Sequence, residues 1–341
     1  GTFGRPVIDT CRGGVAPRRG AEINRLAPLL DVQFARIAVG VAAVEVIEAV
    51  GDVALLLDLG KQVAGADAVY FGIEGLNMRS RSSSNFTLDD MERIARQCAG
   101  ASVRTYLTVN TIIYDSDIEK MRSIVERAHA AGITAIIATD IATIQYCRKV
   151  GIPVHISTQA NISNTEAVRF YAQWADVMVL ARELNMEQVA DIHRHIVEEP
   201  ILGPDGKPVR LEMFCHGALC MAVSGKCYLS LHQMNSSANR GACNQICRRS
   251  YTVRDKETGD ELDIENQYIM SPKDLKTISF LPEMVKAGVS VFKIEGRARG
   301  PEYVYETVSC YSEALQAICD GTFSEERVNE WEERLAKVFN R

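Results

Sequence analysis

Cysteine is the residue whose spacing in this chain points most directly to chemistry. Of the ten cysteines in 341 residues, five lie between positions 215 and 247, where an even distribution would place about one. Thiolates bind soft metal ions and iron–sulfur clusters, and such a group outside a secreted protein indicates a metal site more often than a set of disulfides. The five are Cys215, Cys220, Cys227, Cys243 and Cys247.

The spacing within this group bears on the kind of metal site. Structural zinc sites usually contain two cysteines separated by two residues, and the sequence has no such pair. Six, fifteen and three residues separate Cys220, Cys227, Cys243 and Cys247 in turn, which favours an iron–sulfur cluster over zinc. Cys215 directly follows the predicted strand 211–214 and continues its pattern, so it is expected to pack there.

Eight short apolar runs alternate with amphipathic segments, and this alternation predicts the fold. Strands that are buried on both faces and separated by helices form parallel βαβ units, and eight units make a closed (β/α)8 TIM barrel. The competing fold, a doubly wound sheet, needs a G-x-G-x-x-G turn after its first strand, which this chain lacks. The predicted strands span residues 44–47, 68–71, 103–109, 135–138, 154–157, 177–180, 211–214 and 289–294.

The segments between and around these strands predict the helices and the domain organisation. Helices are expected over 22–44 near the N-terminus and over 272–287 before the eighth strand, and one cysteine-rich insertion follows the seventh strand. The predicted organisation is an otherwise unassigned N-terminal arm and helix over 1–43, a barrel over 44–323 containing the insertion 215–271, and a peripheral C-terminal helix over 324–341.

Polar residues follow several of the predicted strands, where barrel enzymes build their sites. Any one of them could be an ordinary turn residue or a solvated charge, but their convergence at one barrel mouth favours a site. Arginine recurs among them, and guanidinium groups bind carboxylates and phosphates in a bidentate manner. The candidate catalytic residues are His216, Glu295 and Arg297. The candidate substrate-binding residues are Arg79, Arg81, Asn110, Gln159, Arg182 and Arg299.

The segment around Arg297 allows two interpretations. Gly296 lets the backbone bend at the end of the eighth strand, and Glu295 could orient the Arg297 guanidinium or carry a proton. Arg297 would then capture a substrate carboxylate. Alternatively, Glu295 and Arg297 form an ion pair that only closes the barrel.

Composition limits the class of protein. With 38 basic and 44 acidic residues the net charge is -6, which argues against a protein that coats nucleic acid and leaves a local basic groove open. No apolar run is long enough to cross a membrane, and no secretory signal is evident, so a cytoplasmic location is expected. The hydrolase motifs H-E-x-x-H and G-x-S-x-G are absent from the sequence.

The seventh strand and the insertion that follows it resemble peptidase family U32, the collagenase-like proteins. The positions that match the family signature are Glu212, Phe214, Gly217, Ala218, Cys220, Gly225, Cys227 and Ser230. Further similar segments are 66–72, 77–81, 157–161, 239–243 and 293–297.

This resemblance implies a barrel-like fold and a 4Fe-4S cluster bound by Cys220, Cys227, Cys243 and Cys247. It also implies oxygen-independent hydroxylation, despite the peptidase label. One group in the family forms 5-hydroxyuridine in tRNA and depends on prephenate, another modifies a cytidine of 23S ribosomal RNA, and a third pair acts in ubiquinone synthesis. In the ubiquinone group the fourth ligand lies further downstream, near Tyr268, so Cys247 fits the RNA branch.

The resemblance therefore implies an iron–sulfur enzyme that forms 5-hydroxyuridine in tRNA, or acts on ribosomal RNA, with prephenate as co-substrate. The arginines at the barrel mouth would hold this dicarboxylate and RNA phosphate, and a protein partner is left open. One alternative is a true collagenase-like peptidase, for which the chain lacks a recognisable nucleophile–base pair. The other is a non-catalytic, cluster-binding subunit of a hydroxylase complex of the ubiquinone or ribosomal RNA type.

Overall fold

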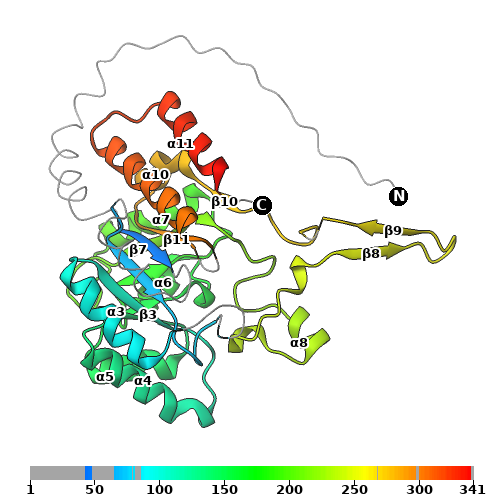
Figure 1. Cartoon of the computed structure of the whole chain (residues 1–341). Coiled ribbons are helices and arrows are strands. Elements are labelled where there is room, and N and C mark those ends of the chain that lie inside the picture. The colour runs from blue at the N-terminus through cyan, green and yellow to red at the C-terminus, as the bar shows by residue number, and fades with distance from the viewer. Residues whose placement is uncertain are drawn as a thin grey trace. The chain divides into compact units, whose positions relative to one another are not determined.

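Eight parallel strands form a closed ring in the computed structural model, which describes residues 43–47, 65–78, 80, 86–266, 268–296 and 299–338 (Figure 1). The first strand of the ring pairs with the last, and β7 pairs with both β6 and β11, so the ring has no open edge. Its members are β1 (Ala43–Ile47), β2 (Ala68–Phe71), β3 (Arg104–Val109), β4 (Ala135–Ala138), β5 (Val154–Ile156), β6 (Val177–Val179), β7 (Arg210–Gly217) and β11 (Val289–Glu295).

The predicted (β/α)8 barrel is therefore confirmed, with each of the eight strands at its expected place. The pairing of β1 with β11 distinguishes this ring from an open doubly wound sheet, whose outer strands do not meet. Because the strands are parallel, their carboxyl ends all lie at one mouth of the barrel.

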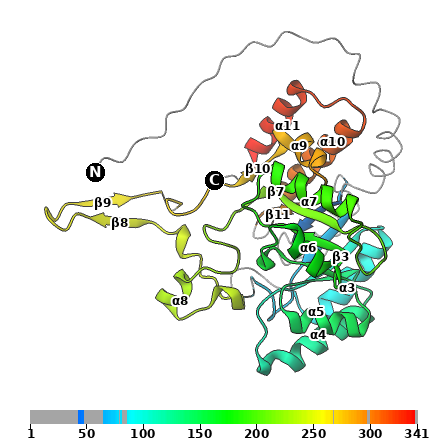
Figure 2. The same cartoon turned by 180° about the vertical axis from the view of Figure 1, so that it is seen from behind.

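Helices cover the outside of the ring (Figures 1 and 2), and the largest apolar core lies between the strands and these helices. Local sequence explains their ends: Thr87 caps the first by accepting a hydrogen bond from the Asp90 backbone N–H, and Gly151 ends another in the left-handed conformation. These helices are α3 (Leu88–Gly100), α4 (Ile118–Ala130), α5 (Ile141–Val150), α6 (Thr165–Ala172), α7 (Met186–Glu198), α9 (Leu281–Lys286), α10 (Pro301–Cys319) and α11 (Glu325–Lys337). Short 3-10 turns occupy η2 (Asp115–Asp117), η3 (Thr158–Ala160) and η6 (Ile278–Phe280).

The helix predicted over 272–287 is wrong in its first half. Leu275–Lys276 form a short strand, β10, antiparallel to the end of β7, and the α-helix begins only at Leu281. Strand β6 pairs only with the first three residues of β7, 210–212. Strand β10 pairs with the last two residues of β7, His216 and Gly217. Backbone groups at the end of β7 thus gain partners, and this pairing overrides the apolar spacing that suggested a helix.

The cysteine-rich insertion between β7 and α9 has little regular structure. Its elements are α8 (Leu229–Met234), η4 (Ala238–Arg240), η5 (Ile246–Arg248) and a hairpin of β8 (Tyr251–Arg254) and β9 (Glu261–Ile264). In both views the hairpin extends away from the barrel (Figures 1 and 2).

A few close polar contacts fix the insertion to the barrel mouth. The Arg240 guanidinium donates to Asp117 at 2.6 Å and to the carbonyl of Ile112, in the loop after β3. Gly241 has a φ of +79°, and a Cβ there would lie 2.2 Å from the Asn77 carbonyl oxygen. Only glycine allows this approach, so Arg240 and Gly241 together hold the insertion over the strand ends.

The structure describes the C-terminal helices but not residues 1–42. The predicted arm and helix over 1–43 lie outside the described residues, apart from Ala43. At the other end, α11 packs on α10 through the buried Trp331, whose indole N–H donates to Glu313 at 2.9 Å. None of the described helices is both long and apolar enough to cross a membrane.

Candidate functional site

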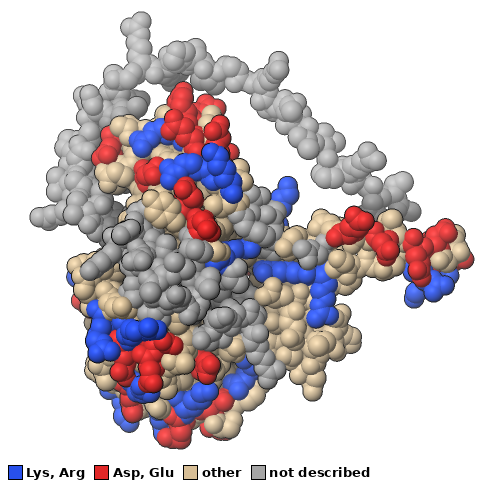
Figure 3. Space-filling model, viewed as in Figure 1, with Lys and Arg blue, Asp and Glu red and all other residues tan. Residues whose placement is uncertain are grey.

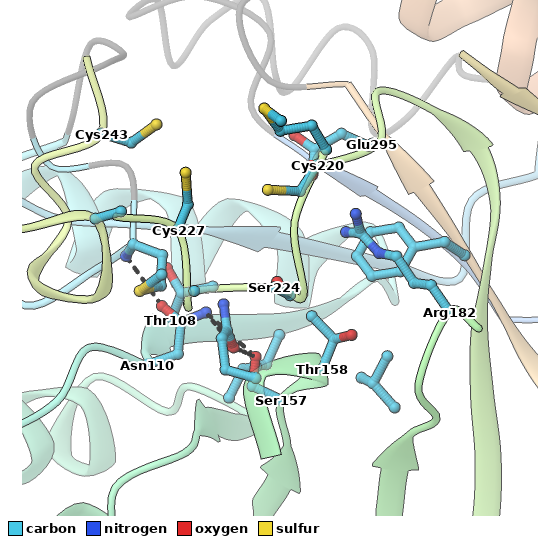
Figure 4. A pocket seen from close by; sticks show the side chains of 18 of the residues that line it. Thr108, Asn110, Ser157, Thr158, Arg182, Cys220, Ser224, Cys227, Cys243 and Glu295 are labelled. Atoms are coloured by element: carbon cyan, nitrogen blue, oxygen red, sulfur yellow. Dashed lines mark hydrogen bonds between the residues drawn. The ribbon is translucent and has the colours of Figure 1, made fainter. Parts of the chain in front are cut away.

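A cavity lies where the insertion covers the carboxyl ends of the strands (Figure 4). The barrel contributes strand-end residues to its wall, and the insertion contributes cysteines and small polar residues. The barrel side includes Tyr70, Asn110, Gln159, Arg182, Phe214, Lys293 and Glu295. The insertion side includes Cys220, Cys227, Cys243 and Cys247.

The four predicted metal-binding cysteines thus share one cavity, although they come from separate turns. All four are free thiols, and each is exposed or half-buried. In Figure 4 the sulfur atoms of Cys220, Cys227 and Cys243 face the same space. Burial raises the pKa of Cys247, Arg248 opposes that shift, and the charges of the other three thiols add to it, so the four are close enough to interact.

Four thiols are a donor set that suits an iron–sulfur cluster chemically. Among the described residues, no three His, Cys, Asp or Glu side chains lie close enough together to ligate one metal ion. A 4Fe-4S cluster binds one thiolate at each of several irons, so its ligands stand further apart than those of a tetrahedral zinc ion. Cys215 differs, as predicted: it is fully buried in β7, and its thiol donates to the Lys293 carbonyl at 3.4 Å.

Asn110 and Gln159, two of the predicted substrate-binding residues, lie side by side on the cavity wall. They follow β3 and β5, and the Asn110 amide Nδ2 lies 3.5 Å from Gln159 Oε1. Ser157 and Thr139 complete a chain of hydrogen bonds across the ends of three neighbouring strands. Such a chain holds both amides in fixed orientations.

A buried ion pair lies deeper in the barrel, at the base of the cavity. Lys293 of β11 donates to Glu212 of β7, and both side chains are almost fully buried. The Lys293 ammonium also lies 3.8 Å from the centre of the Tyr70 ring. The attraction of the carboxylate and of the ring offsets part of the cost of burying this charge.

Arg182 and Glu295 bring further charge to the wall. The Arg182 guanidinium lies 4.1 Å above the centre of the Phe214 ring, where Figure 4 shows it at the side of the cavity. Glu295 lines the same cavity, and its backbone carbonyl accepts a hydrogen bond from Tyr303 at 3.3 Å. Both residues were predicted as site residues from their positions after strands.

His216 is not among the residues that line this cavity. Its ring lies 5.5 Å from that of Tyr311 and 5.8 Å from that of Tyr303, both on α10. Burial, helped by the charges of Lys276 and Arg299, lowers the pKa of His216 to about 4, so the ring is neutral near pH 7. The structure therefore does not bring His216 to the cysteines.

An irregularity in β7 explains this placement. Phe214 pairs with Lys293, but His216 rather than Cys215 pairs with the next residue, Ile294. One extra residue on β7 is a β-bulge, and a bulge changes which face the following side chain occupies. His216 accordingly lies with α10 on the outside of the barrel.

The remaining predicted site residues, three binding residues and the catalytic candidate Arg297, fall in two groups. Arg299 pairs with Asp274 at 3.3 Å, and neither side chain lines the cavity. Arg79, Arg81 and Arg297 lie outside the described residues, so their predicted roles stay predictions.

Tyr70, Phe214 and Lys293 are examples of wall residues that were not among the predicted site residues. Each lies inside a strand rather than after it, and its side chain is directed into the barrel. The sequence offered a signal for Lys293, which lies between two apolar residues of a strand predicted to be buried. A charged side chain is almost never buried unless it is paired, so a lysine at such a position indicates a partner inside the barrel.

Charge is unevenly distributed over the insertion. Residues 251–266, which contain the β8–β9 hairpin, carry six acidic and two basic side chains. Figure 3 shows these acidic residues along the hairpin. This segment therefore does not attract a phosphate backbone.

Comparison with known proteins identifies the family. The sequence profile of peptidase family U32 matches residues 61–341. The chain belongs to peptidase family U32. This agrees with the resemblance of the cysteine segment and with the barrel.

Family U32 relatives carry different names. The chain is 66% identical over 278 residues to a collagenase of Porphyromonas gingivalis, which covers 82% of this chain and 67% of the relative. It is 31% identical over 284 residues to tRNA hydroxylation protein P1 of Bacillus subtilis, and the match covers 81% of this chain and 64% of that relative. It is 34% identical over 260 residues to a 23S rRNA 5-hydroxycytidine synthase of Escherichia coli, and the match covers 75% of this chain and 37% of that relative. The chain thus spans about two thirds of the first two relatives.

Proposed function

We propose that this U32 protein is an oxygen-independent RNA hydroxylation enzyme that binds a 4Fe-4S cluster and forms 5-hydroxyuridine, with tRNA as the substrate. The observation that carries the proposal is the single cavity shared by four free cysteines and by the amides and aromatic rings of the barrel mouth. Relatives named for hydroxylation of tRNA and of ribosomal RNA support it.

Cys220, Cys227, Cys243 and Cys247 would hold the cluster, which supplies electron transfer when bound. Conversion of the C5–H bond of a uracil to C5–OH, with water as the oxygen source, releases two electrons and two protons and needs an external electron acceptor. A group capable of electron transfer beside the base suits this reaction. The barrel side binds and orients: Asn110 and Gln159 offer amide groups, and the Tyr70 and Phe214 rings offer surfaces on which a base can stack.

Prephenate, a dicarboxylate, is the proposed co-substrate. Arg182 places positive charge on the cavity wall, and guanidinium groups favour carboxylates. The acidic hairpin gives RNA no favourable contact, so RNA would approach from another side of the mouth.

Peptidase activity is the second candidate, because the most similar of the relatives above is named a collagenase. A cysteine or serine peptidase needs a base beside its nucleophile. The described residues that line the cavity include cysteines, serines and threonines but no histidine, and Lys293 is held by Glu212. The geometry therefore favours hydroxylation.

Analysis of modified nucleosides tests the proposal. The chain is expressed in a bacterial strain that lacks 5-hydroxyuridine in tRNA and 5-hydroxycytidine in ribosomal RNA, and both RNAs are digested and analysed by mass spectrometry. The proposal predicts 5-hydroxyuridine in tRNA that requires all four cysteines and prephenate synthesis. Unchanged nucleosides in both RNAs, together with collagen cleavage by the cluster-loaded protein, would support the peptidase. Product formation only with an added protein partner would support a subunit role.

A further inference from the structure

The orientation of the Asn110 amide is fixed by a backbone group. The Met78 N–H donates to Asn110 Oδ1 at 3.1 Å. A backbone N–H can only donate, so the atom facing it must be the amide oxygen and not the nitrogen. The Asn110 nitrogen, Nδ2, is therefore directed to the other side, toward Ser157 and Gln159.

This orientation in turn fixes the amide of Gln159. Nδ2 of Asn110 is a donor, so the Gln159 atom 3.5 Å from it must be the oxygen. Thr139 Oγ1 donates to the same oxygen at 3.2 Å, and the Ser157 hydroxyl donates to it as well. Three donors therefore converge on Gln159 Oε1, and the Gln159 nitrogen, Nε2, is directed away from them.

The Gln159 nitrogen has no acceptor among the residues that the structure describes. Gln159 lines the cavity, so this nitrogen offers two N–H donors to whatever the cavity binds. Gln159 is half-buried, and a ligand group that displaces water from this donor must accept a hydrogen bond in return, which favours ligands with a matching acceptor.

The cysteine-rich insertion packs against the Gln159 side chain. Gly225 has a φ of +77°, and a Cβ there would lie 2.9 Å from Gln159 Cγ and 3.1 Å from Met78 Cε. The glycine backbone thus packs directly against this side chain, beside Ser224 and Cys227. The amide is positioned both by its hydrogen bonds and by the cysteine segment.

We infer that Gln159 determines base specificity by donating to the C4 carbonyl oxygen of a uracil ring. This inference rests on the proposed function and names the group that selects its substrate. Uracil and cytosine both present a carbonyl at C2, so the two bases differ at C4, where uracil presents a carbonyl oxygen that accepts from the Gln159 donor. Cytosine presents an amino group at C4, which would place donor against donor.

Nucleotide binding tests this inference. The affinities of uridine and cytidine 5′-monophosphate for the cluster-loaded protein are measured by calorimetry under anaerobic conditions. Wild-type protein should bind the uridine nucleotide about tenfold more tightly. Gln159→Glu keeps an oxygen for Asn110, Ser157 and Thr139 but turns the cavity-facing group into an acceptor, so the preference should reverse.

Two variants control for loss of structure. Gln173→Glu makes the same change on an exposed residue at the end of α6 and should leave the preference unchanged. Asn110→Asp removes the donor that fixes Gln159 and lets the Gln159 amide rotate to donate to the new carboxylate, so the ratio of the two affinities should fall toward one. A merely structural role would lower both affinities together.

Three results overturn the inference. They are equal binding of both nucleotides by wild-type protein, equal loss of both in Gln159→Glu, and binding of neither. The nucleoside analysis separates this from failure of the proposed function: if 5-hydroxyuridine still forms, only the role of Gln159 is wrong.

Discussion

The barrel and its insertion use the same residue, cysteine, in opposite ways. Four thiols of the barrel and its helices, Cys98, Cys147, Cys215 and Cys310, are buried, and burial raises their pKa values, to about 11 for Cys98 and about 12 for Cys147 and Cys310. Such thiols stay protonated and pack as small apolar groups. The insertion instead holds its four thiols at the surface of one cavity, where thiolates can bind metal.

The two regions also differ in what holds them together. Apolar side chains between strands and helices stabilise the barrel. The insertion depends on a few polar contacts such as Arg240 with Asp117, and it exposes Tyr228, Met234 and Leu262. A cluster bound by four of its cysteines would supply the cohesion that a small apolar core cannot.

Loss of a cluster ligand should have the largest effect. Replacing Cys220, Cys227, Cys243 or Cys247 singly by Ser should abolish the brown colour and most of the iron of anaerobically purified protein. Iron analysis and the visible absorption spectrum measure this.

The matched control is Cys319→Ser, which changes an exposed thiol on α10 outside the cavity. It should retain full iron content. Equal iron in the control and in all four ligand variants would contradict the assignment.

The buried ion pair should give the next largest effect, confined to the barrel. Lys293→Met leaves the Glu212 carboxylate buried without its partner, and such a loss costs about 3–5 kcal/mol in the free energy of unfolding. Denaturant unfolding measures it. Lys293→Met with Glu212→Leu should recover most of the stability, because no charge then remains buried. A double variant no more stable than the single one would show that charge burial is not the cause.

The contact between Arg240 and Asp117 should matter less, and only for the insertion. Arg240→Ala removes hydrogen bonds to Asp117 and to the Ile112 carbonyl, worth about 1.5–3 kcal/mol for charged groups. Iron should therefore be released faster to a chelator, while barrel unfolding changes little. Arg254→Ala, which removes an exposed arginine of the hairpin, is the matched control and should leave the rate unchanged.

Acid should weaken the same contact. The hydrogen bond from Arg240 holds the pKa of Asp117 below its ordinary value near 3.8. The contribution of the ionised carboxylate is complete above about pH 5 and is lost as the pH falls through the lowered pKa. Iron release should accelerate over that range in wild-type protein. In Arg240→Ala this acid-dependent step should be much smaller, and an unchanged step would assign it to another group.

Sequence alone predicted the regular part of the molecule well. The eight strands follow from apolar runs such as 68–71 and 135–138, which the structure reproduces without change. The shared cavity of the four cysteines could be expected from their spacing and the family resemblance. Asn110, Gln159, Arg182 and Glu295 reach that cavity because they follow strands of one parallel barrel.

Local deviations from regular structure could not be predicted. The bulge at Cys215 turns His216 away from the mouth, and no pattern in the strand marks it. The pairing of Leu275–Lys276 with the end of β7 depends on where β6 stops, which is a property of the assembled sheet. Likewise, Arg299 pairs with Asp274, a partner 25 residues away.

The most direct test of the central claim is the metal content of the cysteine site. Iron, zinc and acid-labile sulfide are quantified per chain after anaerobic purification, and a Mössbauer spectrum is recorded. A 4Fe-4S cluster at this site should give about four irons and four sulfides bound through thiolates. One zinc per chain with neither iron nor sulfide would contradict this assignment.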